Sequence, residues 1–373
     1  MNIASTVSAV ADFVTERFPV EKMNFGSMVT KKEVPRHRMS WAYYIGGMTL
    51  FFFAVQVATG LLLLFYYEPT VSDAHASVEY ITTHVAGGAL IRNLHAWSSS
   101  AMIFCVIAHL LTTFAMKAFE RPREVVWVSG VAMLLLVFAF GFTGYLLPWN
   151  QIAVNATKVG LQSIEEVGAY LPGALAELPT TVRETIQGEK SVGQATLSRF
   201  YAVHVVVLPL LTLGLLGMHL FGIQLHGMSR GVDAKPRGTE RFFPDFMIKD
   251  LTVWGVVFFV LFVVALCLPF DAFFAYPLAE PFNPLGSTPE GIKPEWYFLF
   301  MFQTLKYLPA KIGPIDGEVL GVLAFGLGGL FWVLVPFLNR TPGHGSRKIV
   351  FTIIGVFIVL FIVVMTIVGY LSP

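Results

Sequence analysis

Cysteine and charge are both scarce in this chain of 373 residues, which has two cysteines and 13% charged residues. Two cysteines imply no disulfide framework, and the sequence has no C-x-x-C-H motif for covalent attachment of a c-type haem. It also lacks the G-x-x-x-x-G-K-[ST] and G-x-G-x-x-G motifs, so a nucleotide site is not expected. Nothing in the sequence indicates binding of nucleic acid.

Apolar residues dominate instead, at 55% of the chain, and the mean hydropathy of +0.68 lies outside the usual range of soluble domains. Seven apolar runs are long enough to cross about 30 Å of hydrocarbon. We expect an all-α integral membrane protein, because lipid offers the backbone of a lone segment no hydrogen-bond partners outside its own helix. The predicted spans A to G cover residues 41–66, 96–116, 125–147, 199–225, 250–270, 317–337 and 349–370.

The predicted organisation has three parts. Residues 1–40 form an amphipathic surface segment, because the first 25 residues lack the basic start and continuous apolar core of a cleaved signal. Residues 41–230 form a four-helix domain and residues 231–373 a three-helix domain, with short surface helices in the C–D and E–F loops. The tail and the B–C, D–E and F–G connections hold 17 of the 25 Lys and Arg residues. The N-terminus is therefore expected on the cytoplasmic, negative side and the C-terminus on the positive side.

Four histidines fall on predicted spans, His95 and His109 on B and His204 and His219 on D. Ionisable residues in a bilayer are costly and face the bundle interior, although any single one can be a hydrogen-bonded structural residue. The fourteen-residue interval on B returns to nearly the same face after roughly 21 Å. On D the interval is fifteen, an offset of about 60° that Pro209 is expected to adjust. Spans B and D run parallel, so His95 is level with His204 and His109 with His219.

Two stacked bis-histidine sites follow, and imidazole suits zinc, copper or haem iron. Haem fits best, because no carboxylate or thiol joins either level and because glycines on spans A and C repeat the fourteen-residue interval. Glycine lets a bulky flat group approach a helix backbone, although a lone glycine pair could reflect abundance in membrane helices. We predict two non-covalent b-type haems. The glycines are Gly46 and Gly60 on span A, and Gly130 and Gly144 on span C.

From about residue 35 to its end, the chain resembles the cytochrome b subunit of quinol-oxidising Rieske–cytochrome b complexes of the cytochrome bc type. The seven spans and the fifteen-residue interval resemble the chloroplast and cyanobacterial variant, in which a short cytochrome b and subunit IV are separate proteins. Both parts are fused in this chain. The matching stretches are "VQVATG" (55–60), "LIRNLHAW" (90–97), "RPREVVWVSGV" (121–131), "GYLLPWNQ" (144–151), "SVGQATLSRFYAVHVVVLPLL" (191–211), "IKD" (248–250) and "PEWYF" (294–298).

The resemblance implies two quinone pockets, one near each membrane face. At the positive-side pocket, Glu295 after Pro294 would accept a proton from quinol, with its pKa raised by the apolar neighbours that include Tyr297. Tyr145 would line the same pocket. Without the resemblance, the favoured reading of Glu295 is the cap of a surface helix that begins after Pro294.

The resemblance assigns Lys249 and Asp250 to the negative-side pocket, where they would bind a quinone carbonyl and relay protons. The alternative for this pair is a solvated helix start. Five residues after His219 the family often has His or Arg facing the quinone, but Gln224 stands here. His226, two residues further on, is a candidate for that role.

Arg92 matches the family's arginine for a haem propionate, and an interfacial snorkelling arginine is its alternative reading. Two other positions depart from the family. Three residues after His109 the family commonly has an arginine near the other haem's propionate, but this chain has Thr112. Lys117 or water would have to replace it. Tyr44 stands where the chloroplast variant has a cysteine that attaches a further haem, so no covalent haem is expected.

The implied activity is that of a quinol:cytochrome c oxidoreductase, or one that uses another high-potential acceptor. Quinol oxidation would send one electron to a Rieske iron–sulfur protein and the other through the two haems to quinone at the opposite face, with proton translocation. A c-type cytochrome and a homodimeric complex are expected, in a bacterial plasma membrane. Menaquinone is the expected quinone, although the sequence does not distinguish it from ubiquinone or plastoquinone.

Two alternative functions stay open. One is a di-haem, quinone-reducing anchor of another respiratory enzyme, and the other is a transporter or structural bundle with ordinary polar histidines.

The tyrosine at position 44 leads to the first testable prediction. Because no thiol is available there for a thioether bond, haem staining of this chain after denaturing electrophoresis should be negative. A c-type cytochrome on the same gel provides the positive control. A stained band at the mass of this chain would contradict the prediction.

Overall fold

The structure is a computed structural model that describes residues 3–18, 32–231, 237–270, 280–286, 292–338 and 346–372. Within these ranges seven helices are long and apolar enough to cross a membrane, which confirms the predicted all-α membrane fold. The spanning segments are Ser40–Leu64, Gly88–Ala115, Glu124–Leu146, Gln194–His226, Phe242–Cys267, Gly317–Leu338 and Thr352–Leu371. Their main helices are α3 (Tyr43–Leu64), α5 (Gly88–Ala115), α6 (Glu124–Leu146), α10 (Leu208–His226), α11 (Met247–Cys267), α14 (Gly317–Leu338) and α15 (Ser346–Leu371).

Three spans start earlier than predicted, with span B beginning at Gly88, span D at Gln194 and span E at Phe242. The predicted starts were residues 96, 199 and 250. An apolar run marks only the part of a helix that lies in hydrocarbon, whereas the helix itself continues into the polar interface. Polar residues near these starts, such as Arg92 in span B, Arg199 in span D and Asp245 in span E, interrupt the apolar run, so the hydropathy criterion placed the starts later.

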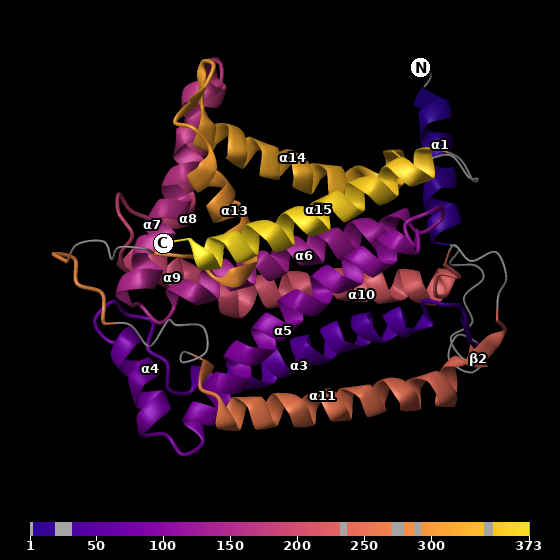
Figure 1. Cartoon of the computed structure of the whole chain (residues 1–373), viewed down its shortest axis with the longest axis horizontal. Helices are drawn as coiled ribbons and strands as arrows, with labels where there is room; N and C mark the ends of the chain where they lie inside the picture. The colour runs from indigo at the N-terminus through magenta and orange to yellow at the C-terminus, as the bar shows by residue number, and fades with distance from the viewer. Residues whose placement is uncertain are drawn as a thin grey trace.

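The spanning helices run alongside one another, and α1 (Ile3–Arg17) crosses their ends at a steep angle (Figure 1). The expected surface segment of residues 1–40 stays a prediction. The chain termini lie at opposite ends of the bundle, as seven crossings require (Figure 1). The split into domains at residue 230 stays a prediction.

Short helices cover the end of the bundle away from α1 (Figure 1). The expected surface helices of the C–D loop are present as α7 (Gln151–Glu166) and α8 (Leu178–Gln187), and that of the E–F loop as α13 (Trp296–Tyr307). The A–B loop adds α4 (Ala74–Thr83), which the sequence analysis did not anticipate. Local signals explain some of these ends: the Asn150 side chain accepts a hydrogen bond from the Ala153 backbone N–H at 2.8 Å and so caps α7.

The remaining elements are small. Strands β1 (Glu33–Pro35) and β2 (Thr239–Arg241) pair antiparallel, with Glu33 opposite Arg241. Strands β3 (Lys311–Ile312) and β4 (Ile315–Asp316) form a second antiparallel pair. The other short helical segments are η2 (Ser40–Ala42), η3 (Val167–Tyr170), η4 (Gly173–Glu177), α9 (Gln194–Ala202), η5 (Val203–Val207) and η6 (Phe242–Phe246).

The fourth span contains a π-helical turn, η5, between α9 and α10. A π-turn accommodates more residues than an α-turn, because its hydrogen bonds run from i to i+5. The turn contains His204, and Pro209 follows in α10. The extra residue of the fifteen-residue interval is therefore absorbed in η5, just before the proline that was expected to adjust the helix.

The three later spans pack on the first four from two directions. Helix α11 lies against α3 and α5, while α14 lies against α6. The second contact includes an aromatic cluster in which the Trp127 indole N–H donates to the Trp332 carbonyl at 2.7 Å. Helix α13 packs between α14 and α15. This packing brings the "PEWYF" stretch back to the four-helix bundle.

Candidate functional site

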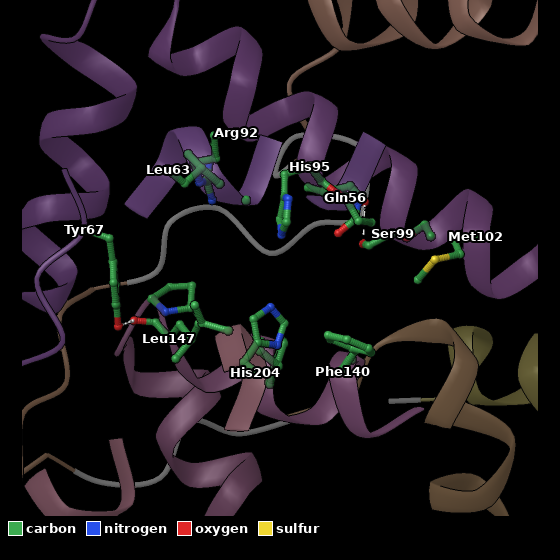
Figure 2. Close-up of a pocket in the computed structure, with 18 of the residues that line it drawn as sticks. Gln56, Leu63, Tyr67, Arg92, His95, Ser99, Met102, Phe140, Leu147 and His204 are labelled. Atoms are coloured by element: carbon green, nitrogen blue, oxygen red, sulfur yellow. Dashed lines mark hydrogen bonds between the residues drawn. The ribbon is translucent and has the colours of Figure 1, made fainter. Parts of the chain in front are cut away.

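A cavity of about 470 Å³ lies inside the four-helix bundle, on the side away from α1. His95 of α5 and His204 of the π-turn η5 line it from opposite walls. Their imidazole rings point toward one another across the cavity (Figure 2). The structure thus brings together the two histidines that the helix periodicity placed at one level.

Hydrogen bonds fix the orientation of both rings. The Nδ1 atom of His95 lies 2.8 Å from the Thr59 hydroxyl, and that of His204 lies 3.0 Å from the Thr143 hydroxyl. Each threonine also donates its one hydroxyl proton at 2.7 Å to the carbonyl four residues earlier in its own helix. The hydroxyl oxygens must then accept from Nδ1–H, which leaves Nε2 of each histidine with a lone pair that can bind a metal.

His109 and His219 form the second level, with ring centroids 6.4 Å apart and ring planes at 71°. A metal-bound imidazole nitrogen lies about 2.0–2.1 Å from its ion, so two rings that share one ion have centroids roughly 6–6.5 Å apart. The Nδ1 atom of His219 donates to the Val126 carbonyl at 2.8 Å. Within the described residues, the buried Nδ1 of His109 has no hydrogen-bond partner.

The donor set fits haem better than a bare ion. A structural ion such as zinc needs about four protein ligands, but the described part of the chain contains no group of three or more His, Cys, Asp or Glu side chains that could hold one. Two facing imidazoles are sufficient where a porphyrin supplies the other four ligands. Both histidine levels therefore fit a b-type haem, which His95 and His204 would hold at one level and His109 and His219 at the other.

Each of the four predicted glycines lies against one histidine ring. A Cβ atom added at Gly144 would come within 2.6 Å of His204 Cε1, and one at Gly46 within 2.9 Å of His109 Cε1. The corresponding distances are 3.3 Å for Gly130 to His219 and 3.4 Å for Gly60 to His95. The sequence analysis expected the glycines to admit a flat group, and the structure shows that they also give the imidazoles room.

The cavity of His95 and His204 extends to the residues expected at the positive-side pocket. Glu295, Tyr145 and Tyr297 all line it, and so does Arg92. Burial, and then the Glu295 carboxylate nearby, raises the pKa of Tyr297 well above its usual value. Its hydroxyl therefore stays protonated at neutral pH and can donate a hydrogen bond. Pro294 precedes Glu295, which is the N-cap of α13.

Lys249 and Asp250, both expected at the negative-side pocket, contact different parts of the chain. The Lys249 ammonium is bound to Glu240 in β2, which also accepts from Arg36 at 2.9 Å. The half-buried Asp250 carboxylate instead packs against Gly47 of α3, and its Oδ1 has no hydrogen-bond partner among the described residues. The contact of Lys249 with Glu240 depends on β2, whose pairing with β1 is a long-range contact. The role of Lys249 and Asp250 at a quinone stays a prediction.

Gln224 binds a different lysine, which the sequence analysis missed. Lys32 donates from Nζ to Gln224 Oε1 at 2.5 Å and lies 4.8 Å from the centre of the Phe242 ring. Burial lowers the pKa of Lys32 to about 8. His226 donates from Nε2 to the Arg17 carbonyl at 3.0 Å, which ties it to α1. No local signal could reveal the contact of Lys32 with Gln224, because 192 residues separate them.

Comparisons with known proteins agree with this geometry. A family model described as cytochrome b/b6/petB matches residues 29–227, and one described as cytochrome b (C-terminal)/b6/petD matches residues 281–373. The cytochrome bc complex cytochrome b subunit of Chlorobaculum thiosulfatiphilum is 41% identical over 362 residues, which cover 96% of this chain and 80% of that protein. A solved structure of a hyperthermophilic respiratory Complex III matches with a TM-score of 0.79 at 27% identity, covering 97% of this chain and 91% of the other.

Removing one histidine tests the assignment of levels. His204→Ala leaves His95 without an opposite imidazole, so the purified protein should lose one of two b-type haems and keep the other with its spectrum intact. The exposed His84 provides a matched control, His84→Ala, which should retain both. Loss of both haems from a folded protein, or of neither, would show that the histidines are paired differently.

Proposed function

The chain belongs to the cytochrome b family of bc-type respiratory complexes, and we propose that it is the di-haem, quinol-oxidising subunit of a quinol:cytochrome c oxidoreductase or of one with another high-potential acceptor. Two facing histidine pairs inside the membrane bundle are the observation that carries this proposal. The two bound b haems would supply one-electron redox chemistry at two depths. Family membership by itself implies b-type haem, and the bis-histidine ligation of two haems is the finer proposal.

The positive-side cavity supports quinol oxidation. Quinol gives up two electrons and two protons when it becomes quinone, so its pocket needs a proton acceptor within hydrogen-bond reach. Glu295 takes one proton and passes it to water on the positive side, and the second proton is released to the same side when the second electron leaves. Tyr145 and Tyr297 line the same cavity, and they position the ring and exclude water. The cavity would hold quinol where one electron could pass to a Rieske iron–sulfur protein and the other to the haem that His95 and His204 would hold.

Quinone reduction takes place at the opposite face, near His109 and His219. There quinone gains two electrons in successive turnovers and takes up two protons from the negative side. Lys32, bound to Gln224, donates one of these protons and regains it from cytoplasmic water. Asp250 is the carboxylate of the pocket, because its Oδ1 is free of hydrogen bonds from the described residues. Lys249, held by Glu240, has a structural role.

The pocket around Glu295 favours this function over a quinone-reducing anchor of another respiratory enzyme, which has no need of a quinol-oxidising site on the positive side. The proposed partners are the Rieske protein and a c-type cytochrome, in a homodimeric complex of a bacterial plasma membrane. The N-terminus lies on the cytoplasmic side and the C-terminus on the positive side. Menaquinone is the proposed quinone.

Glu295→Gln tests the proton acceptor. The variant keeps the size and shape of the side chain but cannot accept a proton as carboxylate does, so quinol oxidation should slow by about 10²–10⁴-fold, the usual contribution of general base catalysis. Haem content should stay near that of the wild type. Glu318→Gln, at an exposed glutamate that accepts from Ser163, is the control. Unchanged turnover of Glu295→Gln across the pH range would remove the catalytic role.

Lys32 predicts a pH dependence for quinone reduction. Its pKa is lowered to about 8, so the ammonium is present below that pH and is lost as the pH rises through it. The rate at which added quinone oxidises the pre-reduced b haem should fall through this range in the wild type. In Lys32→Met this alkaline limb should be absent and the rate low throughout. Arg36→Gln, directly after β1, should behave as the wild type. An unchanged limb in Lys32→Met would exclude Lys32 as the donor.

A further inference from the structure

Arg123 lies where three helices of the bundle meet on the side of α1. It immediately precedes α6, and its Nη2 donates to the carbonyl of His226, the last residue of α10, at 3.0 Å. Tyr43, the first residue of α3, lies within range of its charge. The Nε atom is buried and has no hydrogen-bond partner among the described residues. One donor of this guanidinium is thus desolvated and unused.

The acids nearest in sequence are committed elsewhere or have little effect. Glu124 binds Arg17 through two hydrogen bonds, one of them 3.2 Å from Nε, and both side chains are below 10% exposed. The exposed Glu120 affects Arg123 only weakly. No carboxylate of the described residues lies within ion-pair distance of Arg123. A cation with a buried, unpaired donor and no counter-ion is costly, so this half-buried guanidinium calls for an anion from outside the described residues.

The level of Arg123 in the bundle indicates which anion this is. The same three helices carry Gly46, Gly130 and His219, all of which border the second histidine level. Tyr43 lies three residues before Gly46 in the sequence. Arg123 lies seven residues before Gly130, and His226 lies seven residues after His219. These intervals correspond to about 5–11 Å. A guanidinium at this distance can reach the edge of a flat ring held between His109 and His219.

Thr112 cannot provide the missing charge. Its hydroxyl bonds to carbonyls of its own helix, that of Ala108 at 2.8 Å and that of His109 at 3.1 Å. It is also neutral, whereas each of the two carboxylates of a b-type haem is an anion. A carboxylate at the haem edge would meet the unused Arg123 donor and form a charge-assisted hydrogen bond.

We propose that Arg123 is the cation that binds a carboxylate of the haem held between His109 and His219. The inference rests on the proposed function, because it needs a haem at that level. Arg123, which precedes α6, would then bind the haem carboxylate that Thr112 of α5 cannot bind. A purely structural role, in which Arg123 only satisfies the end of α10, makes a different prediction for the redox potential of that haem.

Redox titration of the purified complex separates the two roles. Arg123→Gln removes a positive charge and leaves the haem carboxylate uncompensated, which favours the oxidised, more positive iron. At a fixed ambient potential the ratio of reduced to oxidised haem at the His109 level should fall about tenfold, or about 59 mV in midpoint potential. The haem at the His95 level is the internal control. Arg121→Gln, at the exposed partner of Glu16, should leave both potentials unchanged.

A second variant keeps the test decisive if Arg123→Gln alone fails to assemble. In the double variant Arg123→Gln/Thr112→Arg, a cation returns three residues after His109, so haem content and potential should recover toward wild type. An arginine at that position cannot restore a bond to the end of α10. Failure of the double variant to recover would overturn the proposal. So would an Arg123→Gln variant that keeps both haems and whose ratio of reduced to oxidised haem at the His109 level stays within twofold of the wild-type ratio. A wild-type protein without two b haems would instead refute the proposed function.

Discussion

The structure depends on holding neutral imidazoles at fixed angles inside an apolar bundle. A bilayer cannot solvate a histidine, so a hydrogen bond from the protein to one ring nitrogen fixes the ring while the other nitrogen faces a metal. Three of the four rings have such a bond, and among the described residues Nδ1 of His109 has none. Threonine hydroxyls of α3 and α6 provide this partner for His95 and His204, and a carbonyl of α6 provides it for His219. The same helices carry the glycines against which the rings lie. The first and third spans thus orient histidines that the second and fourth spans carry.

The rest of the architecture follows from this arrangement. The π-turn η5 brings His204 round to face His95 despite the longer interval on its helix. The later helices then return α13 to the bundle, so that Glu295 lines the same cavity as that histidine pair. On the other side, α1 is attached by the buried pair of Arg17 and Glu124. That attachment occupies the acid next to Arg123 and leaves the arginine for another anion.

Periodic features of the sequence were sufficient to predict the fold and the four histidines. Hydropathy finds spans because lipid imposes one length on every crossing, and a fourteen-residue interval fixes a helix face whatever the surrounding packing. Spacing could not show that Lys249 would bind Glu240, or that Lys32 would reach Gln224 across 192 residues. These contacts depend on how β1, β2 and the end of α10 meet in space. Charged side chains at helix ends can choose among several partners, so their pairing is a tertiary property.

An experimental density map of the purified complex tests the central claim most directly. The account predicts two flat densities, each with a metal at its centre. One should be bound through Nε2 of His95 and His204, and the other through Nε2 of His109 and His219, with the Nδ1 atoms of His95 and His204 on Thr59 and Thr143. A map in which either pair of imidazoles is turned away from its partner, with no such density between them, would contradict it.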